Sequence, residues 1–186
     1  MTKPTIDEFR ELVRGEIITS DDPGYEEARR VYNAMIDKRP LCVVRATGVT
    51  DVIAAVNFAR EADLDLSVRG GGHSVPGFGT NDGGLVIDLS LMKGVRVDPK
   101  NKTARAEGGA TWGDFNHATN AFGLATTGGI ISTTGVGGLT LGGGIGYLAR
   151  GLGLSCDNLI SADVVTADGK VVIASADENA DLFWAL

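Results

Sequence analysis

The sequence predicts an α+β protein of two α/β subdomains, a small parallel βαβ unit followed by a mainly antiparallel sheet with flanking helices. Three observations support this fold class. Residues 41–69 follow a strand–helix–strand pattern, the second half contains short alternating strands, and the 27 glycines cluster at residues 70–84 and 128–153. The composition, 43% hydrophobic and 22% charged, is ordinary for a globular domain.

The first 24 residues form an N-terminal helical segment in this prediction. Thr5 and Glu8 have the spacing of a capping box, and Gly15 can end the helix in the left-handed conformation. A second helix is predicted over residues 25–35.

The parallel unit begins with a buried strand at residues 41–45. Thr50 is expected to cap the helix that follows, and residues 66–69 return as a strand. Two strands joined by a helix pair in parallel through a crossover.

The second half contains predicted strands at residues 85–89, 94–98 and 103–107 and a helix over 111–122 that ends at Gly123. Residues 162–167 and 170–174 alternate around Asp168-Gly169, which predicts a hairpin with a type I′ turn.

The change in pattern near residues 70–84 divides the molecule. Subdomain 1 covers about residues 25–80 and subdomain 2 about residues 81–186.

Charge and apolar patterning exclude several classes of protein. A net charge of −7 argues against a nucleic-acid partner or an anionic membrane surface. No apolar run approaches the ~20 residues that span a bilayer, and the N-terminus has no secretory pattern. Cys42 and Cys156 lie far apart, in no metal-ligand spacing. These features favour a cytoplasmic protein without a bound metal.

The first glycine cluster, Arg69-Gly70-Gly71-Gly72-His73-Ser74, follows directly after a predicted strand. Successive glycines let several backbone N–H groups converge on an anion, so a pyrophosphate fits such a loop. The second cluster, Thr133 to Gly146, mixes glycines with threonines and aliphatic residues, unlike a flexible linker. Neither cluster matches the Rossmann fingerprint well, and the P-loop Gly-Lys-Ser/Thr is absent.

Together the two clusters resemble the FAD-binding domain of the vanillyl-alcohol-oxidase type, in its berberine-bridge-enzyme-like branch of FAD-linked oxidases. The resemblance covers roughly residues 25–186. The matching motifs are Arg69 to Ser74, Gly83-Gly84-Leu85-Val86-Ile87-Asp88-Leu89-Ser90, and Thr133 to Gly146 with Arg150, Gly153-Leu154 and Asp157-Asn158.

The resemblance implies that FAD lies between the two subdomains and that its 8α-methyl group is bonded to His73. A neutral imidazole is a suitable nucleophile; the alternative is a histidine that lines the same loop without a bond. The other expected cofactor contacts are Arg69, Gly70, Gly71, Gly72, Ser74, Gly77, Thr133, Thr134, Gly137, Gly138, Thr140, Gly142, Gly143 and Gly146, with Val164 near the adenine. Some of these glycines can instead serve only to shape turns.

Some family members have a second covalent link, from a cysteine. Ile131 stands at the corresponding position of this sequence, so the resemblance implies a single link.

The family's activity implies an FAD-dependent oxidoreductase that oxidises a small organic substrate by hydride transfer to flavin N5, with oxygen reoxidising the flavin to give hydrogen peroxide. The alternatives are a dehydrogenase with non-covalent FAD and another electron acceptor, and a non-catalytic FAD-binding protein. In the family a C-terminal substrate domain supplies the catalytic base. The apolar end, residues 181–186, favours a chain truncated before the end of its FAD-binding domain; the alternative is a C-terminal helix docked on the protein. We therefore expect no catalytic residue in this chain and no activity from it alone.

Overall fold

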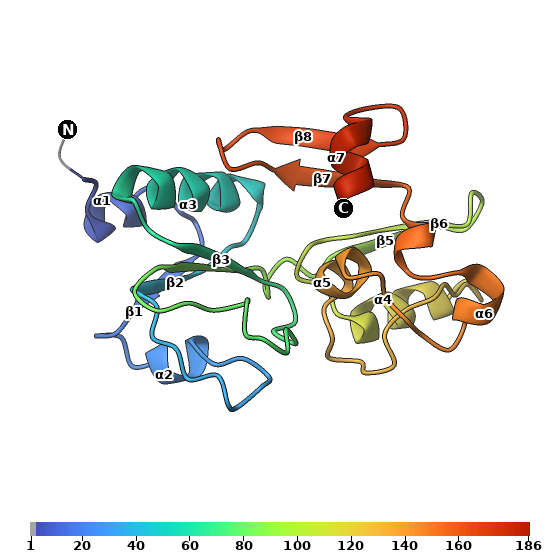
Figure 1. Ribbon diagram of the computed structural model, residues 1–186, viewed down its shortest axis with the longest axis horizontal. Helices are drawn as coiled ribbons and strands as arrows, with labels where there is room; N and C mark the ends of the chain where they lie inside the picture. Colours follow the sequence, from blue (N-terminus) through green and yellow to red (C-terminus); the bar gives the residue numbers. More distant parts are fainter. Residues whose placement is uncertain (1–2) are drawn as a thin grey trace. The chain divides into compact units, whose positions relative to one another are not determined.

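The computed structural model describes residues 3–186, so Met1 and Thr2 of the predicted N-terminal segment lie outside the described residues. The chain forms two compact units. Unit 1 comprises the described residues up to Leu91 together with Val165–Val171, and unit 2 comprises Met92–Val164 and Val172–Leu186. The mixed α+β class expected from the sequence is confirmed (Figure 1).

Unit 1 is built on a four-stranded sheet in the order β1-β2-β4-β3. Strand β1 (Glu16–Thr19) runs antiparallel to β2 (Cys42–Arg45). Strand β4 (Leu85–Asp88) pairs in parallel with both β2 and β3 (Leu66–Arg69). The segment expected to be only helical therefore also supplies an edge strand.

The position of β4 differs from the sequence prediction, which placed residues after about 80 in the antiparallel part. All four residues of β4 are buried. Burial on both faces is typical of a central parallel strand, whose side chains form a continuous apolar run. Because β4 lies between β2 and β3, unit 1 extends to Leu91 and not to about residue 80.

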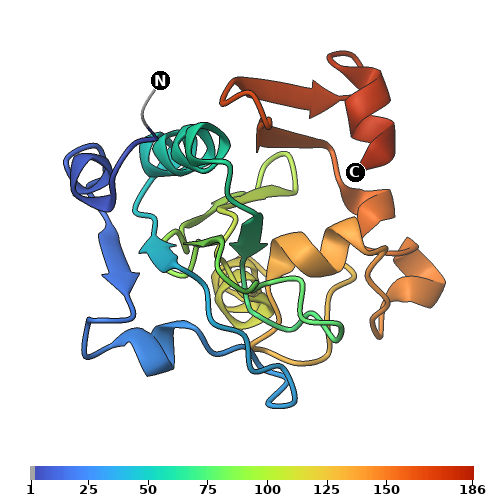
Figure 2. The ribbon, with the colours of Figure 1, turned by 60° about the vertical axis from the view of Figure 1, so that its left-hand side comes forward.

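Helices cover both faces of this sheet. Helices α1 (Ile6–Arg10) and α3 (Val49–Ala62) lie side by side on one face (Figure 2). Phe9 of α1 and Phe58 of α3 stack there, with ring centroids 4.2 Å apart. Helix α2 (Tyr25–Ala28) lies on the other face. The core there consists of Ile18, Tyr25, Ala28, Val43 and Val86.

Helix α2 is much shorter than the predicted helix over residues 25–35. The carbonyl oxygens of Ala28 and Arg30 accept hydrogen bonds from the Arg69 guanidinium, at 2.6 and 3.1 Å. The Tyr32 N–H, which would continue the helix by bonding to Ala28, donates to the Gly72 carbonyl at 3.0 Å. Tertiary hydrogen bonds thus replace the helical ones after Ala28.

Two predicted helix ends are also wrong. Helix α3 begins after Gly48, not Thr50, and no side chain caps it. Gly15 does not have a positive φ; an added Cβ there would lie 1.9 Å from the Arg45 carbonyl oxygen. Asp51 fixes the backbone here, because its carboxylate accepts hydrogen bonds from the backbone N–H groups of Arg14, Gly15 and Thr47. Gly15 therefore serves a close approach of two chain segments.

Unit 2 contains an antiparallel pair, β5 (Val95–Asp98) and β6 (Thr103–Ala106), as predicted. Helix α4 (Trp112–Asn120) begins at a capping box formed by Thr111 and Asp114. It is followed by α5 (Val136–Leu141), α6 (Ala149–Leu152) and the 3₁₀ turn η1 (Cys156–Asn158). Helix α4 ends at Asn120, two residues before the predicted end at residue 122, and Gly123 beyond it has a positive φ of +67°.

Strands β7 (Ser161–Val165) and β8 (Val171–Ser175) pair as predicted, and α7 (Ala180–Ala185) follows. The type I′ turn is wrong. That turn needs a positive φ at both central residues, whereas in this turn only Gly169, at +78°, has one. The hydrogen bonds close a three-residue loop, from Gly169 N–H to Thr166 and from Thr166 N–H to Lys170. Within residues 3–186, no helix is both long enough and apolar enough to cross a membrane.

Candidate functional site

The three parallel strands of unit 1 end at one edge of the sheet. Arg45, Arg69 and Asp88, the last residues of β2, β3 and β4, are in register there. In open α/β sheets, ligands bind outside the carboxyl ends of parallel strands. The first glycine cluster leaves the sheet from this edge, directly after β3.

The buried side chain of Arg69 packs against this loop. Its side chain is 7% exposed and its guanidinium lies 2.9 Å from the Asp88 carboxylate, which is 4% exposed. Carbon atoms of Arg69 lie 3.7 and 3.6 Å from the Cβ positions of Gly72 and Gly79. The geometry thus gives Arg69 a structural role, and its predicted contact with a cofactor stays a prediction.

The glycine loop, residues 70–79, is stabilised by its own hydrogen bonds. Gly72 and Gly77 have positive φ values of +72° and +84°. The Ser74 hydroxyl accepts from the Phe78 N–H at 3.1 Å, and the Ser74 carbonyl accepts from the Gly77 N–H at 3.1 Å. Residues 70–74 are half-buried, so they remain accessible to a ligand in unit 1. His73 lies within this accessible part.

Residues 29–39, here named the Tyr32 loop, pack against the glycine loop. The Tyr32 ring stacks on the His73 ring, with centroids 4.0 Å apart and planes inclined by 17°. The Asn33 side-chain amide donates to the Val75 carbonyl at 2.9 Å. Ile36 fills the space beside Gly77, where an added Cβ would lie 2.8 Å from its Cγ2 atom. The sequence did not indicate these contacts, and it placed Tyr32 and Asn33 in a helix over residues 25–35.

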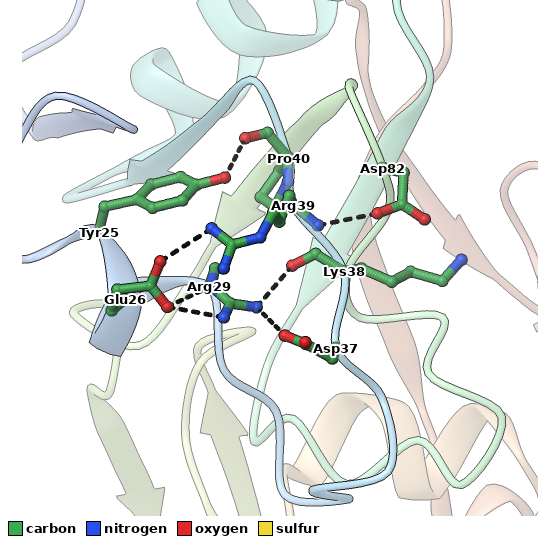
Figure 3. A network of polar contacts seen from close by, with 8 residues as sticks. All are labelled: Tyr25, Glu26, Arg29, Asp37, Lys38, Arg39, Pro40 and Asp82. Atoms are coloured by element: carbon green, nitrogen blue, oxygen red, sulfur yellow. Dashed lines mark hydrogen bonds and ion pairs between the residues drawn. The ribbon is translucent and has the colours of Figure 1, made fainter.

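A network of charged side chains fixes the base of the Tyr32 loop (Figure 3). Arg29, at the start of the loop, donates to Glu26 in α2 and to Asp37 and the Lys38 carbonyl near the end of the loop. Arg39 bonds to Glu26 through its side chain. The hydrogen bonds that the Arg29 guanidinium donates, first to the Glu26 carboxylate and then to that of Asp37, hold its pKa above its ordinary value. Ion pairs of Arg29 with these two carboxylates therefore connect residues near both ends of the Tyr32 loop.

The predicted site residues of unit 2 begin with Thr133 and Thr134, which lie beside the start of α4. The Trp112 N–H donates to the Thr134 carbonyl at 2.9 Å, and the Gly113 N–H donates to Ser132 at 2.8 Å. Gly135 forms an isolated bridge with Thr111. These bonds fix the backbone that leads into α5.

Helix α5 presents bare backbone on one side. Gly138 and Gly142 are exposed and four residues apart, and nothing lies within 4 Å of the Cβ position of Gly138. A Cβ added at Gly137 would lie 3.8 Å from the Gly108 carbonyl oxygen, an ordinary contact distance. A flat group can therefore approach this backbone closely, which fits a flavin cofactor.

Other glycines of the second cluster are required by the protein's own packing. An added Cβ at Gly146 would lie 2.0 Å from the Gly128 oxygen, and one at Gly144 would lie 2.3 Å from the Ser155 hydroxyl. Gly143 has a φ of +98°. Thr140 is buried and Val164, in β7, is half-buried. The second cluster therefore serves packing as well as any ligand.

The structure thus groups the predicted site residues in two sets. Arg69, Gly70, Gly71, Gly72, His73, Ser74 and Gly77 belong to unit 1, whereas Thr133, Thr134, Gly137, Gly138, Thr140, Gly142, Gly143, Gly146 and Val164 belong to unit 2.

Unit 2 also has an open pocket of about 500 Å³ at the end of α4. Asn116, His117 and Asn120 line it together with Tyr147, and it shares no lining residue with the predicted cofactor contacts. His117, expected to be a surface residue, is exposed.

Residues 40–175 match the model of the FAD-binding domain family. The chain is 39% identical over 174 residues to (R)-6-hydroxynicotine oxidase of Paenarthrobacter nicotinovorans, covering 94% of this chain and 38% of that protein. Its structure is similar to that of a berberine-bridge-enzyme-like protein of Physcomitrella patens, with a TM-score of 0.93 and 32% identity over 98% of this chain and 40% of that one. The chain spans about two fifths of the length of these relatives.

A third relative has a chemically defined flavin. Glucooligosaccharide oxidase of Acremonium strictum has a TM-score of 0.86 and 37% identity, covering 92% of this chain and 36% of that one; its cofactor is named a 6-S-cysteinyl, 8α-N1-histidyl FAD. The fold and the two glycine clusters thus define an FAD-binding domain. The chain belongs to the FAD-binding domain family, among the berberine-bridge-enzyme-like FAD-linked oxidases, as its motifs indicated.

Proposed function

We propose that this chain is the FAD-binding part of a flavin-dependent oxidoreductase and that His73 is covalently bonded to the flavin. The observation that carries the proposal is the position of His73, in a half-buried glycine loop at the carboxyl edge of the parallel strands. Its relative from Acremonium strictum has a histidyl FAD, which supports the same bond here.

In this proposal both units contain residues that contact FAD. The glycine loop offers N–H groups to the pyrophosphate, because its glycines leave the backbone uncovered. The exposed backbone at Gly138 and Gly142 accepts the flat flavin ring, and Val164 lies near the adenine. The proposal also gives the cofactor hydroxyl groups as neighbours, from Thr133, Thr134 and Thr140.

When bound, FAD would supply the redox chemistry, which is oxidation of a small organic substrate by hydride transfer to N5, with oxygen as the electron acceptor and hydrogen peroxide as its product. The protein's part is to bind the cofactor, orient it and exclude water. The relatives' names include oxidases of hydroxynicotine and of oligosaccharides. We therefore include in the proposal a small-molecule substrate, bound by a further domain of the intact polypeptide. The proposal also places the protein in the cytoplasm. The two cysteines form no disulfide, which is compatible with this location.

The proposal includes one covalent link only. Ile131 is half exposed and stands where doubly linked relatives are expected to have a cysteine. An aliphatic side chain cannot form a thioether.

The test is acid denaturation of the intact polypeptide after expression with flavin. We expect flavin absorbance in the precipitated protein, and none in the precipitate of His73→Ala. If the wild-type protein releases all of its flavin, a non-covalent dehydrogenase is favoured; if His73→Ala keeps it, another residue forms the bond.

Two further measurements separate the alternatives. Peroxide production by the intact polypeptide distinguishes an oxidase from a dehydrogenase or a non-catalytic flavoprotein. Residues 1–186 alone are expected to produce none with any substrate, because the proposed catalytic base lies in the substrate domain.

A further inference from the structure

Tyr32 lies on His73 although burial does not require it there. Its side chain is 71% exposed, so little apolar area is removed from water by its position. The ring planes are inclined by only 17° and the ring centroids are 4.0 Å apart. In this geometry the tyrosine ring covers one face of the imidazole. The edge of the imidazole, which carries both nitrogen atoms, is not part of the stack.

The backbone next to the stack is fixed on both sides. The Tyr32 N–H donates to the carbonyl of Gly72, the residue that precedes His73, at 3.0 Å. The Arg69 guanidinium bonds to the Arg30 carbonyl at 3.1 Å, two residues before Tyr32. The Asn33 side chain, the next along the chain, bonds to Val75 at 2.9 Å. Tyr32 is thus held in place by hydrogen bonds from its neighbours and by the charged network at the base of its loop (Figure 3).

Attachment of the flavin places a directional demand on His73. The lone pair of an imidazole nitrogen lies in the ring plane, so the ring must turn its edge toward the 8α carbon. A neighbour on the ring's face restricts rotation about the Cβ–Cγ bond without itself covering the edge. Positioning a nucleophile in this way increases the rate of bond formation.

The bond formation balances within the cofactor and His73. A nitrogen–carbon bond forms to the 8α carbon, and one C–H bond of the methyl group and the imidazole N–H bond break. The two protons pass to the flavin and solvent, and the electron pair of the C–H bond reduces the flavin ring. Dioxygen then reoxidises the ring.

We infer that Tyr32 is a positioning residue for this attachment, holding the His73 ring by stacking on its face. The inference rests on the proposed function, because it concerns how the His73 bond forms. The aromatic ring of Tyr32 is sufficient for this positioning, and its hydroxyl group is not needed.

The first test needs no flavin. In the flavin-free intact polypeptide labelled at the histidine Cε1 position, the His73 signal is assigned by its loss in His73→Ala. Stacking places this proton in the ring current of Tyr32, so Tyr32→Ala should shift the signal and Tyr32→Phe should leave it nearly unchanged. An unmoved signal in Tyr32→Ala would overturn the inference whatever the fate of the proposed function.

The second test follows attachment when flavin-free protein is mixed with FAD. Acid precipitation at successive times gives the rate. We expect Tyr32→Ala to attach flavin roughly three- to tenfold more slowly, the factor that corresponds to loss of an aromatic pair. Total flavin bound before acid should stay close to wild type, and Tyr32→Phe should attach at the wild-type rate.

Met35→Ala is the matched control, since Met35 is an exposed residue of the same loop. It should attach flavin at the wild-type rate. A wild-type rate in Tyr32→Ala, or a slow rate in Tyr32→Phe, contradicts the stacking role. Absence of covalent flavin in the wild-type protein contradicts the proposed function instead.

Discussion

Arg69 combines a buried ion pair with two hydrogen bonds to backbone carbonyl groups. Arg69→Met would keep much of the side-chain volume but leave the Asp88 carboxylate and those carbonyls without this donor. Breaking a buried pair from one side costs about 3–5 kcal/mol. We expect a loss of that size in the free energy of unfolding, measured by urea denaturation of the intact polypeptide.

Arg96→Met is the control for this prediction, since Arg96 is an exposed residue of β5. Its effect should stay within about 0.5 kcal/mol. If both variants unfold at the same urea concentration, the Arg69 contacts do not stabilise the folded state.

The two cysteines should differ in reactivity. Cys42 is fully buried in β2, and burial raises the pKa of its thiol to about 11. Because the thiolate is the reactive form, Cys42 should resist alkylation at pH 8 in the folded protein. Cys156 is partly exposed and should react first. Peptide mass spectrometry after brief alkylation distinguishes the two, and prompt modification of Cys42 would contradict the buried position.

The sequence predicted residue roles well where one motif sets them. The capping boxes at Thr5 and Thr111 form locally, and the first of these was predicted from spacing alone. Asp51, Asp88 and Tyr32 were missed, because their partners are distant in sequence. No pattern of neighbouring residues indicates such contacts.

The glycine loop and the Tyr32 loop fit together at Gly77. Gly77 has a φ of +84°, and an added Cβ would lie 2.8 Å from Ile36. Gly77→Ala should therefore cost about 1–2 kcal/mol for the left-handed backbone, and about 1–3 kcal/mol more for crowding. Urea denaturation measures the sum.

Gly83→Ala separates the two contributions. Gly83 also has a positive φ, of +69°, but nothing lies within 4 Å of its Cβ position. It should show the backbone cost alone. In an Ile36→Ala background, the cost of Gly77→Ala should fall toward that of Gly83→Ala; an unchanged cost would exclude crowding by Ile36.

At the scale of elements, local signals predicted existence better than length. The helix at residues 25–35 has suitable residues throughout, yet it ends at Ala28 because Arg69 and Gly72 take its hydrogen-bonding groups. In the β7–β8 hairpin, Asp168-Gly169 marked the turn correctly. The loop has three residues and not two, since only Gly169 is left-handed.

At the scale of the whole molecule, the fold class and the family followed from the sequence, but the strand order did not. The predicted crossover from β2 to β3 is present, and β4 enters between these strands. Strand order depends on which apolar strands are buried on both faces, a property that β4's four residues alone do not reveal. The candidate site was predicted as two glycine clusters; the Tyr32 loop that supports one of them required the structure.

Acid should destabilise the molecule through its hydrogen-bonded carboxylates. Burial acts to raise the pKa of Asp51, which is 2% exposed, but hydrogen bonds from Thr47, Arg14 and Gly15 outweigh it and lower the pKa. The Thr111 backbone and hydroxyl likewise lower the pKa of Asp114. In both cases the folded state holds its proton less tightly than the unfolded chain, in which an aspartate titrates near pH ~4.

The stabilisation from these groups is therefore present above pH ~4 and is lost as the pH falls through the lower folded-state values. The urea midpoint of the intact polypeptide should be nearly constant from neutral pH to about pH 5 and decrease below pH ~4. Asp51→Asn should lower the midpoint at pH 7, since an amide nitrogen would face backbone donors, and should make the acid decrease shallower. A variant curve that runs parallel to the wild-type curve at every pH would show that Asp51 does not contribute to the acid response.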